Sequence, residues 1–106
     1  MDEVFRALAD RTRRAMLDKL FENDGLTLAE LCEGQPMSRQ AVSKHLAILE
    51  DAGLVVAVWR GREKIHFLNP MPVQEISERW IAKYARERLR AVSSLKRALE
   101  AINEET

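Results

Sequence analysis

The stretch from residue 37 to residue 53 constrains this chain most, because it combines a helix start, two unlike faces and a helix stop. Ser38 can cap the start, and Gly53 can adopt the left-handed conformation that ends a helix. Apolar residues recur at helical spacing and predict a core-facing side: Val42, Leu46 and Leu49. The other side carries small or hydrogen-bonding groups: Gln40, Ser43, Lys44 and Ala47. Such groups suit close approach to base edges and phosphates in a DNA major groove, so this helix is a candidate recognition helix.

Two helices are predicted at the N-terminus. The first covers residues 2–9 and places three apolar residues on one side: Val4, Phe5 and Leu8. Asp10 can cap the second, over residues 11–22, whose predicted core stripe is Met16, Leu17, Leu20 and Phe21. Three arginines crowd its first turn, where the macrodipole disfavours cations: Arg11, Arg13 and Arg14. Two interpretations stay open for them, a solvated face with local ion pairs or contact with a phosphate backbone.

A short third helix is predicted between these two helices and residue 37. Thr27 and Glu30 have the spacing of a capping box, in which each side chain satisfies a free backbone amide. The helix ends near Cys32, and Gly34–Pro36 then breaks the chain. Two short helices joined in this way, the second with a polar outer face, are typical of a helix-turn-helix.

After Gly53 the apolar period changes to two, and residues 54–68 predict a β-hairpin with its turn at Gly61–Arg62. Basic residues gather at or beside the tip: Arg60, Arg62 and Lys64. A basic-tipped hairpin directly after a helix-turn-helix indicates a wing that holds the sugar-phosphate backbone or enters the minor groove. Both faces of the hairpin carry apolar residues, so the sequence leaves open whether Ile65 or His66 faces the core.

Residues 73–102 form the longest helical pattern, with apolar residues at three- and four-residue steps. Such a helix spans roughly 45 Å at 1.5 Å per residue, longer than a domain of this size can cover alone. We therefore predict a homodimer in which the first and last helices form the interface, through Val4, Phe5, Leu8, Ile81, Tyr84, Val92, Leu95 and Leu99. The alternative is a long helix that wraps its own core.

The amino-acid composition limits the class of protein but does not identify a binding partner. The 17 basic and 17 acidic side chains cancel, so any argument for nucleic-acid binding rests on where the charges lie. Residues 1–10 lack the pattern of a secretory signal, and no apolar run approaches the length of a membrane span. The single cysteine cannot form an internal disulfide. We expect a cytoplasmic protein with no membrane partner.

The string SRQAVSKHLAILEDAGLV followed by RGREKIHFLNP resembles the ArsR/SmtB family of winged-helix transcriptional repressors, and nearly the whole chain shares the resemblance. In that family a Ser-x-His-Leu step lies in the recognition helix, as residues 43–46 do here. The family wing carries a Gly-Arg turn and ends in Leu-Asn-Pro, as this hairpin does. The resemblance implies a homodimer that binds a palindromic operator and blocks transcription.

Metal-sensing members of that family carry Glu-Leu-Cys-x-Cys before the recognition helix, whereas residues 30–34 here read Glu-Leu-Cys-Glu-Gly. A site for a soft metal needs about three or four donors, and Cys32 supplies one. The last helix offers carboxylates without an imidazole, because the only histidines are His45 and His66. We expect the non-metal-sensing type, without a metal or cofactor, and Cys32 as a small buried hydrophobe. Whether Cys32 has a redox role stays open.

Catalysis is not expected, because the sequence shows no phosphate-cradling glycine pattern and no nucleophile with a matching base. His45 lies about 60° from the centre of the apolar face of its helix, which favours a hydrogen-bonded, partly buried structural role. The same role is expected of His66.

The sequence thus predicts one mainly helical domain over residues 1–106, a winged helix-turn-helix with a small β-hairpin. Its parts are N-terminal helices in 2–36, a recognition helix in 38–52, a wing in 54–68 and a dimerisation helix in 73–102. The predicted contacts with double-stranded DNA are Ser38, Arg39, Gln40, Ser43, Lys44, Arg60, Arg62 and Lys64. Two alternatives remain, a metal- or thiol-responsive repressor and a winged-helix module that binds another protein. The operator, the regulated genes and any small-molecule effector are not specified by the sequence.

Overall fold

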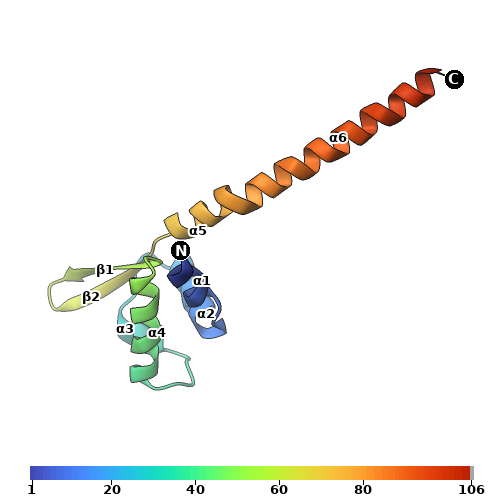
Figure 1. The fold of residues 1–106 in the computed structure, drawn as a ribbon. Coiled ribbons are helices and arrows are strands. Elements are labelled where there is room, and N and C mark those ends of the chain that lie inside the picture. Colours follow the sequence, from blue (N-terminus) through green and yellow to red (C-terminus); the bar gives the residue numbers. More distant parts are fainter. Residues whose placement is uncertain (106) are drawn as a thin grey trace. The chain divides into compact units, whose positions relative to one another are not determined.

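The computed structural model describes residues 1–105, which form helices and one β-hairpin (Figure 1). The elements follow in the order α1 (Asp2–Leu8), α2 (Arg11–Glu22), α3 (Leu28–Cys32), α4 (Arg39–Asp51), β1 (Val55–Arg60), β2 (Glu63–Leu68), α5 (Met71–Ile76), the π-helical turn η1 (Ser77–Ile81) and α6 (Ala82–Glu105). The chain divides into two compact units, one up to Pro72 and one from Val73. The mainly helical class with a small antiparallel hairpin is therefore confirmed.

The core of the first unit lies where its helices meet the hairpin. The apolar face predicted for α4 is confirmed, since Val42, Leu46 and Leu49 are all buried. Helices α2 and α3 and strand β1 pack against α4, and Met16, Leu31 and Leu54 are buried as well. The prediction for Phe21 was wrong, because its side chain is 79% exposed. At about 100° per residue, Phe21 lies well to one side of the stripe of α2, in the last turn before the chain leaves the helix.

The predicted helix starts are confirmed by side-chain caps. Asp10 Oδ2 accepts a hydrogen bond from the Arg13 backbone amide at 3.0 Å, and Ser38 Oγ accepts one from the Ala41 amide at 3.1 Å. Thr27 and Glu30 form the reciprocal capping box. Each cap satisfies a backbone donor that the first turn of a helix leaves unpaired, and together the caps fix where α2, α3 and α4 begin.

The capping box of α3 yields a stability prediction. Thr27→Ala is expected to lower the free energy of unfolding by about 1 kcal/mol, measured by urea unfolding, because the amide of Glu30 loses its partner.

Hydrogen bonds from the backbone and hydroxyl of Thr27 lower the pKa of Glu30 below its ordinary value of 4.5. Folding therefore gains from Glu30 above that ordinary value, and the gain disappears as the pH falls through the lowered pKa.

Ser93→Ala is the matched control, since it removes an exposed hydroxyl from the middle of α6. Its effect is expected to stay within about 0.5 kcal/mol. Equal losses in the two variants would contradict the role assigned to the capping box.

The hairpin register settles which residues face the core. Trp59 pairs with Lys64 and Ala57 pairs with His66, so these four side chains share one face, called here the inner face of the hairpin. His66 is 3% exposed, which places this face against the helices. Ile65 lies on the outer face, opposite Val58. The question that the sequence left open is thus answered in favour of His66.

The last helical segment begins two residues earlier than predicted. The helix opens at Met71, whose backbone amide donates to Asn69 Oδ1 at 3.2 Å, and Pro72 fits the first turn because no amide is needed there. The turn η1 interrupts the segment before α6. The apolar side chains that face one side of this segment remain 54–63% exposed: Ile81, Tyr84, Val92, Leu95, Leu99 and Ile102. Within the described residues, no helix has the length and hydropathy needed to cross a bilayer.

Candidate nucleic-acid interface

A groove of about 420 Å³ lies between the start of α3, one flank of α4 and the inner face of the hairpin. Helix α4 contributes Arg39, Ser43, Leu46, Ala47 and Glu50, and the hairpin contributes Trp59, Arg62, Glu63, Lys64 and His66. Thr27, Leu28 and Ala29 close the third side. The groove therefore joins the predicted recognition helix to the predicted wing.

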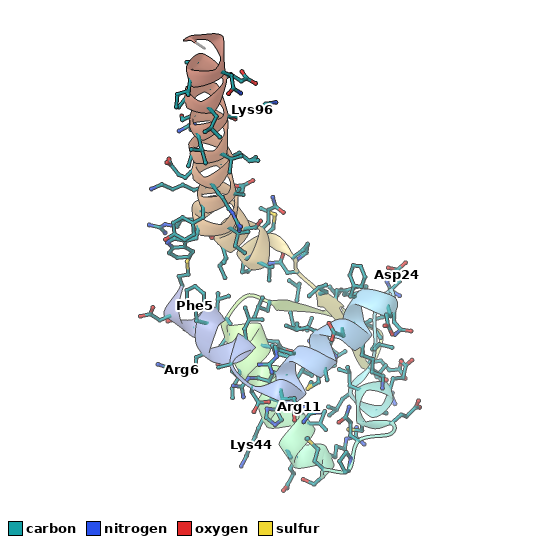
Figure 2. All side chains as sticks on the ribbon, turned by 90° about the vertical axis from the view of Figure 1, so that its right-hand side faces the viewer. Phe5, Arg6, Arg11, Asp24, Lys44 and Lys96 are labelled. Carbon is teal, nitrogen blue, oxygen red and sulfur yellow. The ribbon has the colours of Figure 1, made fainter. Side chains whose placement is uncertain are left out.

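The exposed side of α4 extends beyond this groove. Arg39 and Ser43 line the groove, whereas Gln40 and Lys44 lie on the neighbouring outer face of the helix and are also exposed. Figure 2 shows Lys44 projecting from α4, away from the body of the helices. Ser38 is exposed at the start of the helix, where its hydroxyl serves as the cap. All five predicted contacts on α4 are therefore reachable from outside.

The three basic residues of the hairpin do not lie on one surface. Arg62 and Lys64 line the groove. The guanidinium of Arg60 instead lies 5.7 Å from the centre of the Phe67 ring, on the outer face of the hairpin. The structure thus gathers Arg39, Arg62 and Lys64 in one groove and sets Arg60 apart from them.

Two acidic residues, Glu50 and Glu63, line the groove together with these cations. Glu50, near the end of α4, has Oε2 at 3.6 Å from Lys64 Nζ and Oε1 at 3.4 Å from His66 Nε2. His66 Nδ1 lies 3.0 Å from the carbonyl oxygen of Leu26 and donates to it, since a carbonyl can only accept. These contacts connect the recognition helix to strand β2, and they confirm the structural role expected of His66.

The arginines at the start of α2 have a use that the sequence did not reveal. Arg13 Nε donates to the carbonyl of Ala7 at 2.8 Å, and Nη2 donates to that of Arg6 at 2.9 Å. Arg14 donates to the carbonyl of Leu8 at 2.8 Å. These carbonyls end α1, so the cations complement the negative end of its dipole. Neither of the two interpretations that the sequence left open, a solvated face or a phosphate contact, applies to the Arg13 side chain. The side chain of Arg11 is exposed.

Arg13 also reaches the back of the recognition helix. Its Nη1 lies 3.2 Å from His45 Nδ1, and because a guanidinium can only donate, Nδ1 accepts and the ring proton lies on Nε2. The Arg13 backbone amide and, secondarily, its charge lower the pKa of Asp10, whose carboxylate is 3.8 Å from the same His45 nitrogen. The hydrogen-bonded, partly buried role predicted for His45 is confirmed.

Three groove features were missed from the sequence: Trp59, Glu50 and the start of α3. The signal for Trp59 was present, since a two-residue turn at Gly61–Arg62 pairs Trp59 with Lys64. It could not be used while the inward face of the hairpin was unknown. Among residues 1–105, no three His, Cys, Asp or Glu side chains cluster where they could hold a metal, and Cys32 is half-buried.

Comparison with known proteins places this geometry in a family. A helix-turn-helix domain model matches residues 8–58. The chain is 41% identical over 86 residues to the uncharacterized HTH-type transcriptional regulator YuzN of Bacillus subtilis, covering 76% of this chain and 94% of that protein. It is 32% identical over 84 residues to the transcriptional repressor SdpR of the same organism, covering 79% of this chain and 91% of that protein.

A solved structure agrees with the sequence relatives. An ArsR-like transcriptional regulator from Rhodococcus sp. RHA1 superposes with a TM-score of 0.73 at 31% identity, over 94% of this chain and 90% of its own. All three relatives are named as regulators of transcription. With the capped helix pair, the hairpin and the groove between them, these matches show that the chain belongs to the ArsR/SmtB family of winged helix-turn-helix, DNA-binding transcriptional regulators.

Proposed function

We propose that this protein is a homodimeric transcriptional repressor, acting in the cytoplasm, that binds an inverted-repeat operator in double-stranded DNA. The groove between α4 and the hairpin carries the proposal, because its three cations outnumber its two carboxylates, Glu50 and Glu63, although the chain has no net charge. The similarity to a transcriptional repressor supports the direction of regulation.

The exposed stripe of α6 supports a dimer. Val92, Leu95, Leu99 and Ile102 alternate steps of three and four residues, which is the spacing of a coiled-coil seam. A second copy of the chain would cover this stripe in a two-fold arrangement. On α1, Phe5 is exposed and Leu8 is half-buried, so a second copy could contact both, whereas Val4 is buried.

In the proposed complex, α4 enters the major groove and the hairpin follows the adjacent backbone. Gln40 can pair with adenine through two hydrogen bonds, Lys44 can donate to guanine, and Ser43 suits either base. Arg39 can reach a base or the next phosphate. The hairpin cations would hold the backbone or enter the minor groove: Arg60, Arg62 and Lys64. Two-fold symmetry places the half-sites about 34 Å apart.

The direct test is a binding titration with the DNA upstream of the chain's own gene at two salt concentrations, followed by footprinting. Saturable, sequence-selective binding with a symmetric footprint is expected. Weak binding that does not depend on the DNA sequence and decreases as the salt concentration rises would favour a protein-interaction module instead. Release of DNA by zinc, arsenite or an oxidant, abolished in Cys32→Ser, would identify a metal- or thiol-responsive repressor.

Two substitutions separate base reading from backbone contact. Gln40→Ala is expected to change the ranking of operator variants and to cost about 1–3 kcal/mol of binding free energy at the preferred base. Arg62→Ala is expected to weaken all sequences alike and to reduce the slope of log K against log salt by about one. Both are measured by fluorescence anisotropy on a panel of single-base operator variants. An unchanged ranking with Gln40→Ala would remove Gln40 from the reading surface.

A further inference from the structure

Trp59 occupies the point on the inner face of the hairpin where the core ends and the groove begins. The next pair inward on this face, Ala57 with His66, packs against the helices, and His66 is buried. Trp59 and its cross-strand neighbour Lys64 instead line the groove. The indole is 66% exposed, so its packing against this chain accounts for only a small part of its surface.

The groove around Trp59 combines an aromatic surface with three cations and two carboxylates, Glu50 and Glu63, so positive charge is in excess. Arg39 stands on the α4 side, and Arg62 and Lys64 stand on the hairpin side. This mixture suits a ligand in which negative charge and apolar surface alternate at short distances. The backbone of DNA has that character, because each phosphate is flanked by a deoxyribose ring whose C–H edges are apolar. The groove is also continuous with the exposed face of α4 that would enter the major groove.

The opposite face of the hairpin provides the contrast. Val56 and Val58 are exposed there, but the residues lining the groove do not include them. Val58 is adjacent to Trp59 in the same strand and points away from the groove. Trp59 and Val58 therefore lie on opposite surfaces of the hairpin, so a substitution of Val58 can serve as the control for a substitution of Trp59.

We propose that Trp59 is a further DNA-contacting residue, whose indole packs against a deoxyribose of the strand that follows the groove. This inference rests on the proposed function and adds an apolar contact to its charged ones. Lys64 holds the neighbouring phosphate, and the indole Nε1–H can donate to a sugar or phosphate oxygen. Because the contact is mainly apolar, it strengthens binding without releasing counterions.

The test compares W59A, W59F and V58A in operator titrations over a range of salt. W59A is expected to bind about tenfold more weakly at every salt concentration, with an unchanged salt slope, since it loses the burial of an aromatic ring. W59F keeps a ring and is expected to stay within about threefold of wild type, as is V58A. Both positions are exposed, so all three variants are expected to keep the thermal unfolding midpoint of the wild-type protein, which checks that they fold.

Tryptophan emission gives a second readout. Operator DNA is expected to change the emission of the wild-type protein, and W59F is expected to lose most of that change. If W59A binds like wild type while Arg62→Ala still weakens binding, the inference about Trp59 fails and the proposed function stands. If the wild-type protein binds no DNA selectively, the proposed function fails first. If W59A alters dimer dissociation in sedimentation and leaves DNA affinity unchanged, the occupant is a second copy and the inference is overturned.

Discussion

Replacing Leu95 and Leu99 of α6 together with glutamate is expected to turn the protein into a monomer and to weaken operator binding by about 100-fold or more. Both side chains lie in the exposed apolar stripe, where two charges from each chain would face each other across the proposed seam. A dimer binds its second half-site at a high effective concentration, and a monomer loses that advantage. Sedimentation velocity and operator titration measure the two effects.

A charge-matched control is available on the same helix. Ser93→Glu with Ser94→Glu adds the same number of charges outside the stripe and is expected to leave both the dimer and the affinity in place. Circular dichroism checks that α6 stays helical in both variants. A persistent dimer in the leucine variant would show that the stripe is not the interface.

Arg13→Ala is expected to lower the free energy of unfolding by about 2–4 kcal/mol, the largest loss anticipated from a single polar substitution here. One guanidinium binds two carbonyls at the end of α1 and His45 on α4. Its removal leaves two partly buried acceptors, the Ala7 carbonyl and His45 Nδ1, without this donor, whereas the Arg6 carbonyl keeps the amide of Ala9. Arg13→Lys is expected to recover little, because a single ammonium cannot reproduce the planar fork. Urea unfolding followed by circular dichroism measures the loss.

Arg14→Ala is the matched control for Arg13→Ala. Arg14 is exposed and donates one hydrogen bond, to the carbonyl of Leu8, so its loss is expected to cost about 1 kcal/mol or less. Equal effects of the two substitutions would show that the contacts of Arg13 with His45 and the two carbonyls add no more to stability than the single hydrogen bond of Arg14.

Local signals in the sequence predicted most of the first unit. Thr27, Ser38 and Gly53 each act within four residues of their own position, through capping or a left-handed backbone, and each is found as predicted. The core face of α4 followed from helical spacing alone. Such features depend on short stretches of chain, so no knowledge of the rest of the fold was needed.

Long-range pairing set the limit of prediction. The hydrogen-bond partners of Arg13 come from α1 and α4. No local sequence pattern predicts that an arginine side chain will bind a backbone carbonyl of another helix. Likewise, His66 and Ile65 are both plausible core residues in a strand with two apolar faces, and a choice between them fixes the role of Trp59. The hairpin part of the candidate site was therefore predicted as three cations, but their division between the two faces of the hairpin was not.

Glu50 links α4 to the hairpin through its contacts with Lys64 and His66. In the proposed complex, α4 and the linked hairpin would contact the duplex at a set distance from each other. DNA whose groove width does not match that spacing must be deformed to fit, and the cost depends on the stiffness of base steps that no side chain touches. The operator is therefore expected to constrain the shape of its uncontacted base pairs as well as the identity of the contacted ones.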